Sequence, residues 1–330
     1  MVLTDRFNRP VIGARISVNS SLRCNYSCIF CHKEGIFNEP RYMTPEEIER
    51  VISVLYRFGV RYVKITGGEP MLRKDIVDIV GRIKRVGIHE ISMTTTGFRL
   101  ENLAWDLREA GLDRVNISLH SLKRDRYYFI TKMNRKDETL KAVEASIDAG
   151  LTPIKLNMVI LKGVNVDEVW DMIEYSYSLG GGETNIIQFI ELLNVDPNFF
   201  KQYFYPLDNI EKEIEPRVVK KYRRSLHNRM VYILDNNVHI EFVKPMWNNA
   251  FCMGNDRIRI TYDGKFKPCL MRSDNHVDFI SYIREGYGDE YIAKKFLEAV
   301  YNREPFFKSN REMLDLSNIG EHIDKTVCPI

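Results

Sequence analysis

The sequence has no long hydrophobic run and few cysteines, and both absences narrow the class of protein. No apolar stretch approaches the ~20 residues that a transmembrane helix requires. The residues from Met1 to Arg9 lack the apolar core of a secretory signal. We therefore expect a cytoplasmic protein. Six cysteines in 330 residues are too few for a disulfide scaffold, and their clustering favours metal binding.

A strong excess of one charge is also missing. The chain has 48 Lys and Arg residues against 45 Asp and Glu residues, a formal net charge of +3. This balance indicates neither nucleic acid nor an anionic membrane as a partner. The length predicts about two domains, and 44% hydrophobic residues allow a large core.

Strand and helix signals alternate over residues 1–192. The predicted strands are 11–18, 60–66, 90–95, 114–119, 153–161 and 184–190, and helical segments separate them. One helix start is marked by a capping box, with Thr44 before Pro45 and Glu47. Such alternation predicts an α/β fold with right-handed βα units and a parallel sheet. Because a complete eight-stranded barrel needs about 250 residues, we expect a partial (β/α)6 barrel of the TIM type, with a doubly wound sheet as the alternative.

A different pattern over residues 193–330 predicts a C-terminal α+β domain that closes the barrel mouth. Two hairpins are expected, around Asn236-Asn237 and around Asp263-Gly264. Residues 194–205 are aromatic and predicted to be irregular. The basic run from Lys220 to Arg224 could attract a triphosphate or nucleic acid, but a solvated charged face is the favoured interpretation.

Three cysteines lie within eight residues after the first predicted strand. Cys24, Cys28 and Cys31 have the spacing C-x3-C-x2-C. Three thiolates can bind three irons of a [4Fe–4S] cluster and leave the fourth iron open to an external ligand. The cysteine spacing alone is also compatible with a zinc site in which His32 is the fourth ligand.

The turn Gly67-Gly68-Glu69-Pro70 follows the second predicted strand. It is typical of a βα turn, and it also permits close backbone approach to a ligand whose amino group the carboxylate could hold.

Polar residues occupy alternate positions on several predicted strands and therefore share a face. These pairs are Lys64 and Thr66, Asn116 and Ser118, Lys155 and Asn157, and Arg257 and Arg259. Since a lysine is costly in a dry core, the pairs predict a polar lumen.

Together, the cysteine motif and the Gly-Gly-Glu-Pro turn resemble those of radical S-adenosylmethionine enzymes. In that superfamily the open iron chelates S-adenosylmethionine, which the reduced cluster cleaves to a 5′-deoxyadenosyl radical. Over nearly the whole chain the sequence resembles GTP 3′,8-cyclases, the molybdenum cofactor biosynthesis protein A family. The segments that carry this resemblance are 5–10, 15–18, 64–73, 94–97, 116–119, 155–159, 189–191, 257–261, 263–265 and 269–270.

The resemblance implies a lyase that converts GTP to (8S)-3′,8-cyclo-7,8-dihydroguanosine 5′-triphosphate, the first step of molybdenum cofactor biosynthesis. It implies S-adenosylmethionine as cosubstrate, an electron donor of the ferredoxin or flavodoxin type, and a downstream cyclic pyranopterin monophosphate synthase. We expect a monomer or homodimer with no nucleic-acid or membrane partner. A radical S-adenosylmethionine paralogue with another substrate is the alternative.

Matching positions imply roles for individual residues. The first cluster would be held by Cys24, Cys28 and Cys31. Contacts to S-adenosylmethionine are implied for Phe30, Gly68, Glu69, Asn116, Ser118 and Leu193. Contacts to GTP are implied for Arg15, Lys64, Thr94, Lys155, Arg257 and Arg259, the last two also being catalytic candidates.

The second cluster motif departs from the family pattern C-x2-C-x13-C. Cys252 and Cys269 match the outer positions, whereas Asn255 stands in the middle, and asparagine is a poor ligand for iron. We expect a second [4Fe–4S] cluster whose third ligand is Asp256 or, less favoured, Asn255. The alternatives are that Cys328 supplies the third thiolate ligand or that the second cluster is absent.

Two further features carry less weight. Residues 317–320 resemble the Gly-Gly ending of the family, but here the sequence continues to residue 330. His120 and His227 are expected to be structural.

Overall fold

The computed structural model describes residues 2–20, 22, 24–33 and 42–306. Cys328 and the ending at residues 317–320 lie outside the described residues. Among the helices in the described ranges, none is long and apolar enough to cross a membrane.

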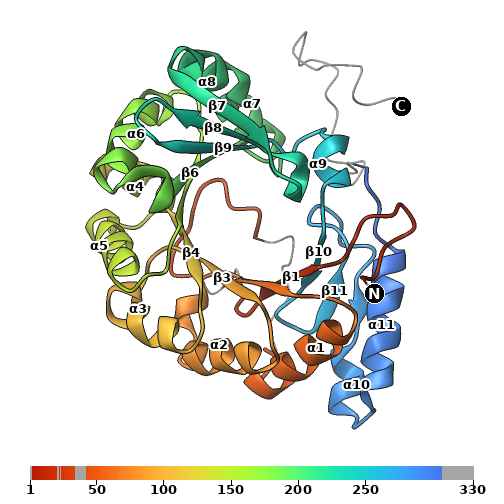
Figure 1. Ribbon diagram of the computed structural model, residues 1–330. Helices are drawn as coiled ribbons and strands as arrows, with labels where there is room; N and C mark the ends of the chain where they lie inside the picture. The colour runs from red at the N-terminus through yellow and green to blue at the C-terminus, as the bar shows by residue number, and fades with distance from the viewer. Residues whose placement is uncertain (1, 21, 23, 34–41, 307–330) are drawn as a thin grey trace.

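Six parallel strands form the wall of the barrel, as the alternating pattern predicted. They are β1 (Gly13–Ser17), β2 (Tyr62–Thr66), β3 (Glu90–Thr95), β4 (Arg114–Ser118), β5 (Ile154–Val159) and β6 (Asn185–Ile190), each paired in parallel with the next. The helices between them are α1 (Pro45–Arg57), α2 (Ile76–Arg85), α3 (Leu100–Glu109), α4 (Arg124–Thr131), α5 (Lys136–Asp148) and α6 (Val169–Ser178). Figure 1 shows the strands as a ring with these helices on its outer side. The partial (β/α)6 barrel is thus confirmed.

Strands from the second half of the chain extend both ends of the same sheet. The strand order is β12-β11-β10-β1-β2-β3-β4-β5-β6-β9-β8-β7. At one end β10 (Arg257–Ile260) pairs in parallel with β1, and at the other β9 (His239–Val243) pairs in parallel with β6. The outer strands are β7 (Val218–Arg223), β8 (Met230–Leu234), β11 (Lys265–Lys267) and β12 (Val277–Asp278). Both predicted hairpins are present, as β8–β9 and β10–β11.

The second half also carries the helices α7 (Pro197–Tyr203), α8 (Leu207–Ile214), α9 (Asn249–Met253), α10 (Ile280–Arg284) and α11 (Asp289–Tyr301). The prediction of an irregular segment over 194–205 is wrong because this segment contains α7. Asp196 caps the helix: its Oδ1 accepts hydrogen bonds from the N–H groups of Asn198 and Phe199 at 2.9 and 3.1 Å.

Alternate residues of the barrel strands point to opposite faces. Ile16, Ile65 and Ile117 are fully buried in the core cluster that also contains Ile48 of α1. Their strand neighbours are polar and line the inside of the ring. The predicted polar lumen therefore results from strand alternation. The capping box that starts α1 is also confirmed, since Thr44 and Glu47 exchange hydrogen bonds of 2.9 and 3.2 Å.

Candidate active site in the barrel lumen

The three clustered cysteines lie in the loop that follows β1, which crosses the centre of the ring in the view of Figure 1. Cys24 and Cys28 are half-buried and Cys31 is exposed. Burial raises the pKa of Cys24 to about 12 and also raises that of Cys28, and the charges of the neighbouring thiolates add to both shifts. The N–H groups of Tyr26 and Lys33 donate to Sγ of Cys24 and of Cys31, each at 3.4 Å. Thiols in such surroundings ionise when iron binds, and N–H···S contacts tune iron–sulfur clusters, so this donor set fits a three-cysteine cluster.

The end of α4 fixes the backbone on both sides of Cys28. The N–H of Ser27 donates to the carbonyl oxygen of Thr131 at 3.1 Å, and the N–H of Ile29 donates to that of Ile130 at 3.0 Å. In the ranges that the structure describes, no three His, Cys, Asp or Glu side chains converge as a single metal ion would require. A four-iron cluster spreads its ligands more widely than one ion does.

The Gly-Gly-Glu-Pro turn packs directly on the segment that follows β1. Gly67 has φ of +143°, and a Cβ there would lie 2.5 Å from the carbonyl oxygen of Asn19. Only glycine fits such a position. The N–H of Gly68 donates to the same oxygen at 3.1 Å, and Asn19 Nδ2 donates to the carbonyl oxygen of Glu69 at 3.0 Å.

The carboxylate of Glu69 is fully buried and joins this turn to β3. Its Oε1 accepts from the N–H of Met71 at 3.0 Å and from Thr95 Oγ1 at 2.7 Å, and Oε2 accepts from the N–H of Thr96 at 2.6 Å. Burial raises the pKa of Glu69, against these hydrogen bonds. Glu69 thus has a structural task, and its contact with S-adenosylmethionine stays a prediction.

Several buried polar atoms of the lumen lack a hydrogen-bond partner among the described residues. They are Oδ1 of Asn116, Oδ1 of Asn157 and Oγ1 of Thr96. Ser118 stands beside Asn157 in the sheet register. Because buried polar groups are normally paired, these atoms fit a polar ligand at the carboxyl ends of β3 to β5.

The two remaining candidates for S-adenosylmethionine contacts are Phe30 and Leu193. Phe30 packs edge-on against His120, with ring centroids 4.8 Å apart. Leu193 lines a second cavity, together with Cys252 and Cys269.

Cationic side chains gather in the lumen. Burial lowers the pKa of Lys64 well below its usual value, and the charges of Arg15, Arg114, Arg257 and Lys155 lower it further. Four predicted GTP-binding residues therefore lie within electrostatic range of one another. In a medium of low dielectric constant, such repulsion favours the binding of a polyanion.

The register of the sheet places the other predicted GTP residues in the same wall. Arg259 pairs with Arg15 across β10 and β1, and Thr94 pairs with Asn116 across β3 and β4. Burial lowers the pKa of Arg257 to about 10.

Sequence reasoning did not place Arg114, Glu241, Arg224 or Arg229 in this wall, although alternation would have revealed the first two. Arg114 stands two residues before Asn116 and so shares its face, where it pairs with Glu90 at 2.6 Å. Glu241 occupies the corresponding face of β9, in register with Gln188. The remaining two, Arg224 and Arg229, lie outside regular strands.

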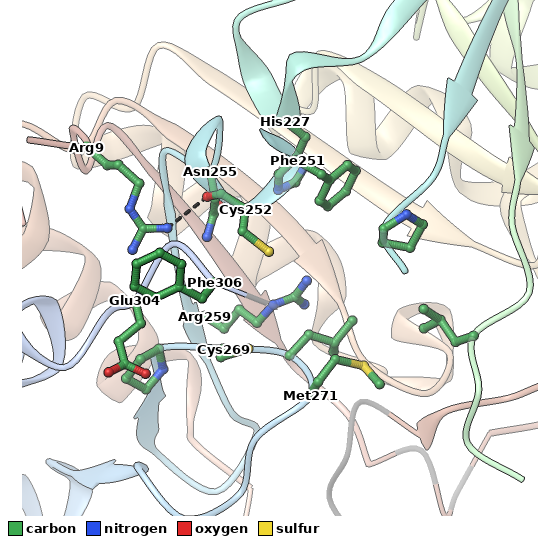
Figure 2. A pocket seen from close by; sticks show the side chains of 14 residues that line it. Arg9, His227, Phe251, Cys252, Asn255, Arg259, Cys269, Met271, Glu304 and Phe306 are labelled. Atoms are coloured by element: carbon green, nitrogen blue, oxygen red, sulfur yellow. Dashed lines mark hydrogen bonds between the residues drawn. The ribbon is translucent and has the colours of Figure 1, made fainter. Parts of the chain in front are cut away.

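Cys252 and Cys269 line a second cavity, shown in Figure 2. Burial raises the pKa of Cys252 to about 11, and the charge of Cys269 adds to the shift. The other lining residues are Arg9, Leu193, His227, Pro245, Phe251, Asn255, Arg259, Pro268, Leu270, Met271, Glu304 and Phe306.

Asn255, rather than the favoured Asp256, shares this cavity with the cysteines. Asp256 Oδ1 instead lies 3.6 Å from Nε of Arg257. The preference for Asp256 is therefore not supported by its position. His227, expected to be merely structural, also lines the cavity and stacks on Phe251 with centroids 4.1 Å apart.

Comparisons with known proteins give matches to both halves of the chain. Residues 18–176 match the model of the Radical SAM superfamily, and residues 185–309 match that of Molybdenum Cofactor Synthesis C. The chain is 44% identical over 321 residues to the probable GTP 3′,8-cyclase of Thermoplasma volcanium, covering 95% of each chain. It is 44% identical over 315 residues to that of Thermococcus kodakarensis, covering 93% of this chain and 100% of the other. The chain belongs to the GTP 3′,8-cyclase family.

Two solved structures share the fold of this member of the GTP 3′,8-cyclase family. Streptococcus suis SuiB bound to S-adenosylmethionine superposes with a TM-score of 0.58 at 16% identity, over 91% of this chain and 66% of that chain. The protein anSMEcpe with bound AdoMet gives a TM-score of 0.60 at 14% identity, over 93% and 83%. Membership of the superfamily implies a [4Fe–4S] cluster and S-adenosylmethionine.

Proposed function

We propose that this protein is a GTP 3′,8-cyclase, which converts GTP to (8S)-3′,8-cyclo-7,8-dihydroguanosine 5′-triphosphate in molybdenum cofactor biosynthesis. The observation that carries the proposal is the 44% identity to the Thermoplasma volcanium protein over 95% of the chain. The cationic lumen supports it independently, because a nucleoside triphosphate requires several positive charges at its phosphates.

Cys24, Cys28 and Cys31 would hold the first cluster. When bound, this cluster and S-adenosylmethionine supply a 5′-deoxyadenosyl radical that removes a hydrogen atom from the substrate. The unpaired oxygen atoms of Asn116, Asn157 and Thr96 are available to polar groups of a ligand beside it.

Arg15, Lys64, Lys155 and Arg257 would bind the triphosphate, with Thr94 and Arg259 completing the same wall. The chain's main task is to orient C3′ of the ribose and to exclude water, because an oriented reaction in a dry site avoids most of the entropic cost and side reactions. Cations fixed on barrel strands need no rearrangement on binding.

The cavity of Cys252 and Cys269 would hold a second [4Fe–4S] cluster with a non-cysteine third ligand. Its support is the joint placement of the two cysteines and Asn255 around one cavity. On this proposal residues 1–192 carry the radical chemistry, and residues 193–330 carry this cluster.

Two partners follow from the proposed reaction. A low-potential donor of the ferredoxin or flavodoxin type would reduce the first cluster. A cyclic pyranopterin monophosphate synthase would consume the product.

The function is tested by anaerobic turnover of the reconstituted protein with dithionite, S-adenosylmethionine and GTP deuterated at C3′. We expect deuterated 5′-deoxyadenosine and the cyclised nucleotide, both detected by mass spectrometry. A Cys28→Ala variant should give neither. Unlabelled 5′-deoxyadenosine without a product from GTP would contradict the proposal and favour a paralogue with another substrate.

The variant Arg257→Ala should separate GTP conversion from the cleavage of S-adenosylmethionine. It should lower GTP conversion by at least about 100-fold, since it removes a cation of the substrate wall, while slow uncoupled cleavage of S-adenosylmethionine continues. Arg223→Ala on the exposed edge strand is the control. Loss of cleavage as well would contradict this division of roles.

A further inference from the structure

A carboxylate buried in the lumen gathers three cations. Glu241 is fully buried. Its Oε2 lies 2.5 Å from Nζ of Lys155, and its Oε1 lies 3.1 Å from Nη1 of Arg224 and 3.6 Å from Nε of Arg229. Gln188 Nε2 also donates to Oε2. Both oxygens are therefore fully engaged.

The two arginines come from a connection outside the barrel. Arg224 follows the end of β7 and Arg229 precedes β8, with the short 3-10 helix η7 (Leu226–Asn228) between them. The N–H of His227 in this helix donates to the carbonyl oxygen of Gly254 at 2.6 Å. The connection is thus anchored beside the cysteine cavity while its arginines reach the lumen. The exposed basic run ends where Arg224 turns inward, which corrects the expectation of a wholly solvated face.

The charges of this group do not balance. Three cations face one carboxylate, and the charges of Asp256 and Arg114 also act on Arg229. The pKa of Lys155 is lowered to about 7, chiefly by burial and also by the charges of Arg224 and Arg229, against the attraction of Glu241. Uncompensated buried cations are costly, so a folded chain tolerates them where an anion binds.

A purely structural role for this group would not require three cations around one carboxylate. A single cation would neutralise Glu241, and the further cations of the group then add cost without compensation. The side chain of Arg224 also remains 31% exposed, against 11% for Arg229, so part of this side chain is accessible to a ligand.

Building on the proposed cyclase function, we propose that Arg224 and Arg229 bind the phosphate chain of the substrate together with Lys155. Glu241 is the positioning residue that aims all three cations at it. The contacts of Glu241 and the excess of positive charge carry this inference. It extends the triphosphate wall from the barrel strands to the connection between β7 and β8.

The experiment compares the binding of GTP, GDP, GMP and guanosine to the reconstituted protein by anaerobic calorimetry. Arg224→Gln and Arg229→Gln should each weaken GTP binding by about 10- to 100-fold, the range expected for lost charge-assisted hydrogen bonds. Guanosine binding should not change. Arg217→Gln is the matched control, because Arg217 pairs with Asp235 on the surface at 2.8 Å.

The test of Glu241 has to distinguish a role in positioning the three cations from a role in the stability of the fold. Glu241→Gln should raise KM for GTP by about 10-fold or more while guanosine affinity stays constant, and Glu241→Asp should restore part of the loss. Thermal unfolding and iron content identify any variant that fails to fold. In that case Arg224→Gln, at a partly exposed side chain, decides the matter.

The outcomes separate this inference from the function on which it rests. A wild-type protein that binds guanosine as tightly as GTP would overturn both. If the wild type prefers GTP and the arginine variants keep that preference, only the inference fails. Equal losses for GTP and guanosine would also overturn it, since they indicate a structural role alone.

Discussion

Arg9 Nη1 donates a hydrogen bond of 2.8 Å to the carbonyl oxygen of Cys252, across 243 positions of the sequence. Asp5 fixes this guanidinium, with its Oδ2 at 2.8 Å from Arg9 Nε and at 3.4 Å from Arg303 Nη1. Arg303 in turn donates to the carbonyl oxygen of Asn255. The N-terminal segment and the residue that closely follows α11 therefore clamp the turn that carries the predicted cluster ligands.

Asp5→Asn should loosen this clamp. It removes the charge shared by two buried arginines, and breaking such a buried group costs about 3–5 kcal/mol. Chemical unfolding should show the loss, and iron content should fall. Asp289→Asn is the control, because its partners Arg50 and Arg57 are partly exposed and such pairs contribute under about 1 kcal/mol. An Asp5→Asn protein as stable as the wild type would refute the clamp.

GTP binding should be coupled to proton uptake. Since burial lowers the pKa of Lys155 to about 7, part of the free protein lacks this proton at pH 7.5. A bound polyanion raises the pKa, so binding takes up protons and affinity falls as the pH rises from 6.5 to 8.5. Calorimetry in buffers of different ionisation enthalpy measures the uptake.

A variant whose charge does not titrate in this pH range shows whether Lys155 takes up the proton. Lys155→Arg should remove most of the pH dependence, because an arginine stays protonated over this range. Lys201→Arg, at an exposed site, should leave it unchanged. Uptake that persists undiminished in Lys155→Arg would assign the proton to another group, with Lys64 the next candidate.

Gly67→Ala should abolish S-adenosylmethionine binding. The added Cβ would meet the carbonyl oxygen of Asn19 at 2.5 Å, so the turn must move away from β1. The expected cost exceeds about 3 kcal/mol, more than backbone strain alone. Gly163→Ala tests the positive φ without a clash, since nothing lies within 4 Å of its Cβ. Equal losses in the two variants would show that the close contact is unimportant.

Asn255→Cys should complete the cluster motif of the second cavity. A third thiolate should raise iron retention and slow loss of the cluster in air, because iron prefers thiolate to amide ligands. Iron counts and Mössbauer spectra follow the change. Asp256→Cys, whose parent residue does not line the cavity, should have no such effect. Equal retention in the wild type and Asn255→Cys would mean that the native ligand set already suffices.

Local patterns predicted the barrel strands well because each strand and its helix are neighbours in sequence. The bounds of β3 were predicted correctly, and Thr44 was identified as the cap of α1. The signal for α7 was present as well, in the capping Asp196 followed by Pro197, but the aromatic residues of this segment masked it.

Long-range pairing explains what the sequence could not show. Hairpin signals revealed that β10 pairs with β11, whereas its parallel pairing with β1 depends on residues more than 240 positions apart. That pairing places Arg259 beside Arg15. The inward path of Arg224 and Arg229 likewise depends on how the connection packs against α9, which no local pattern records.

The order of the sheet has a consequence for the nascent chain. β1 and β6 each leave the ribosome long before β10 and β9, the strands that cover their outer edges. Until β9 has been translated, the half-built barrel carries two open edges of the kind that recruit other strands, and until β10 has been translated it still carries one. Synthesis of this protein therefore passes through a stage with exposed strand edges, and the pairing of β9 and β10 ends that stage.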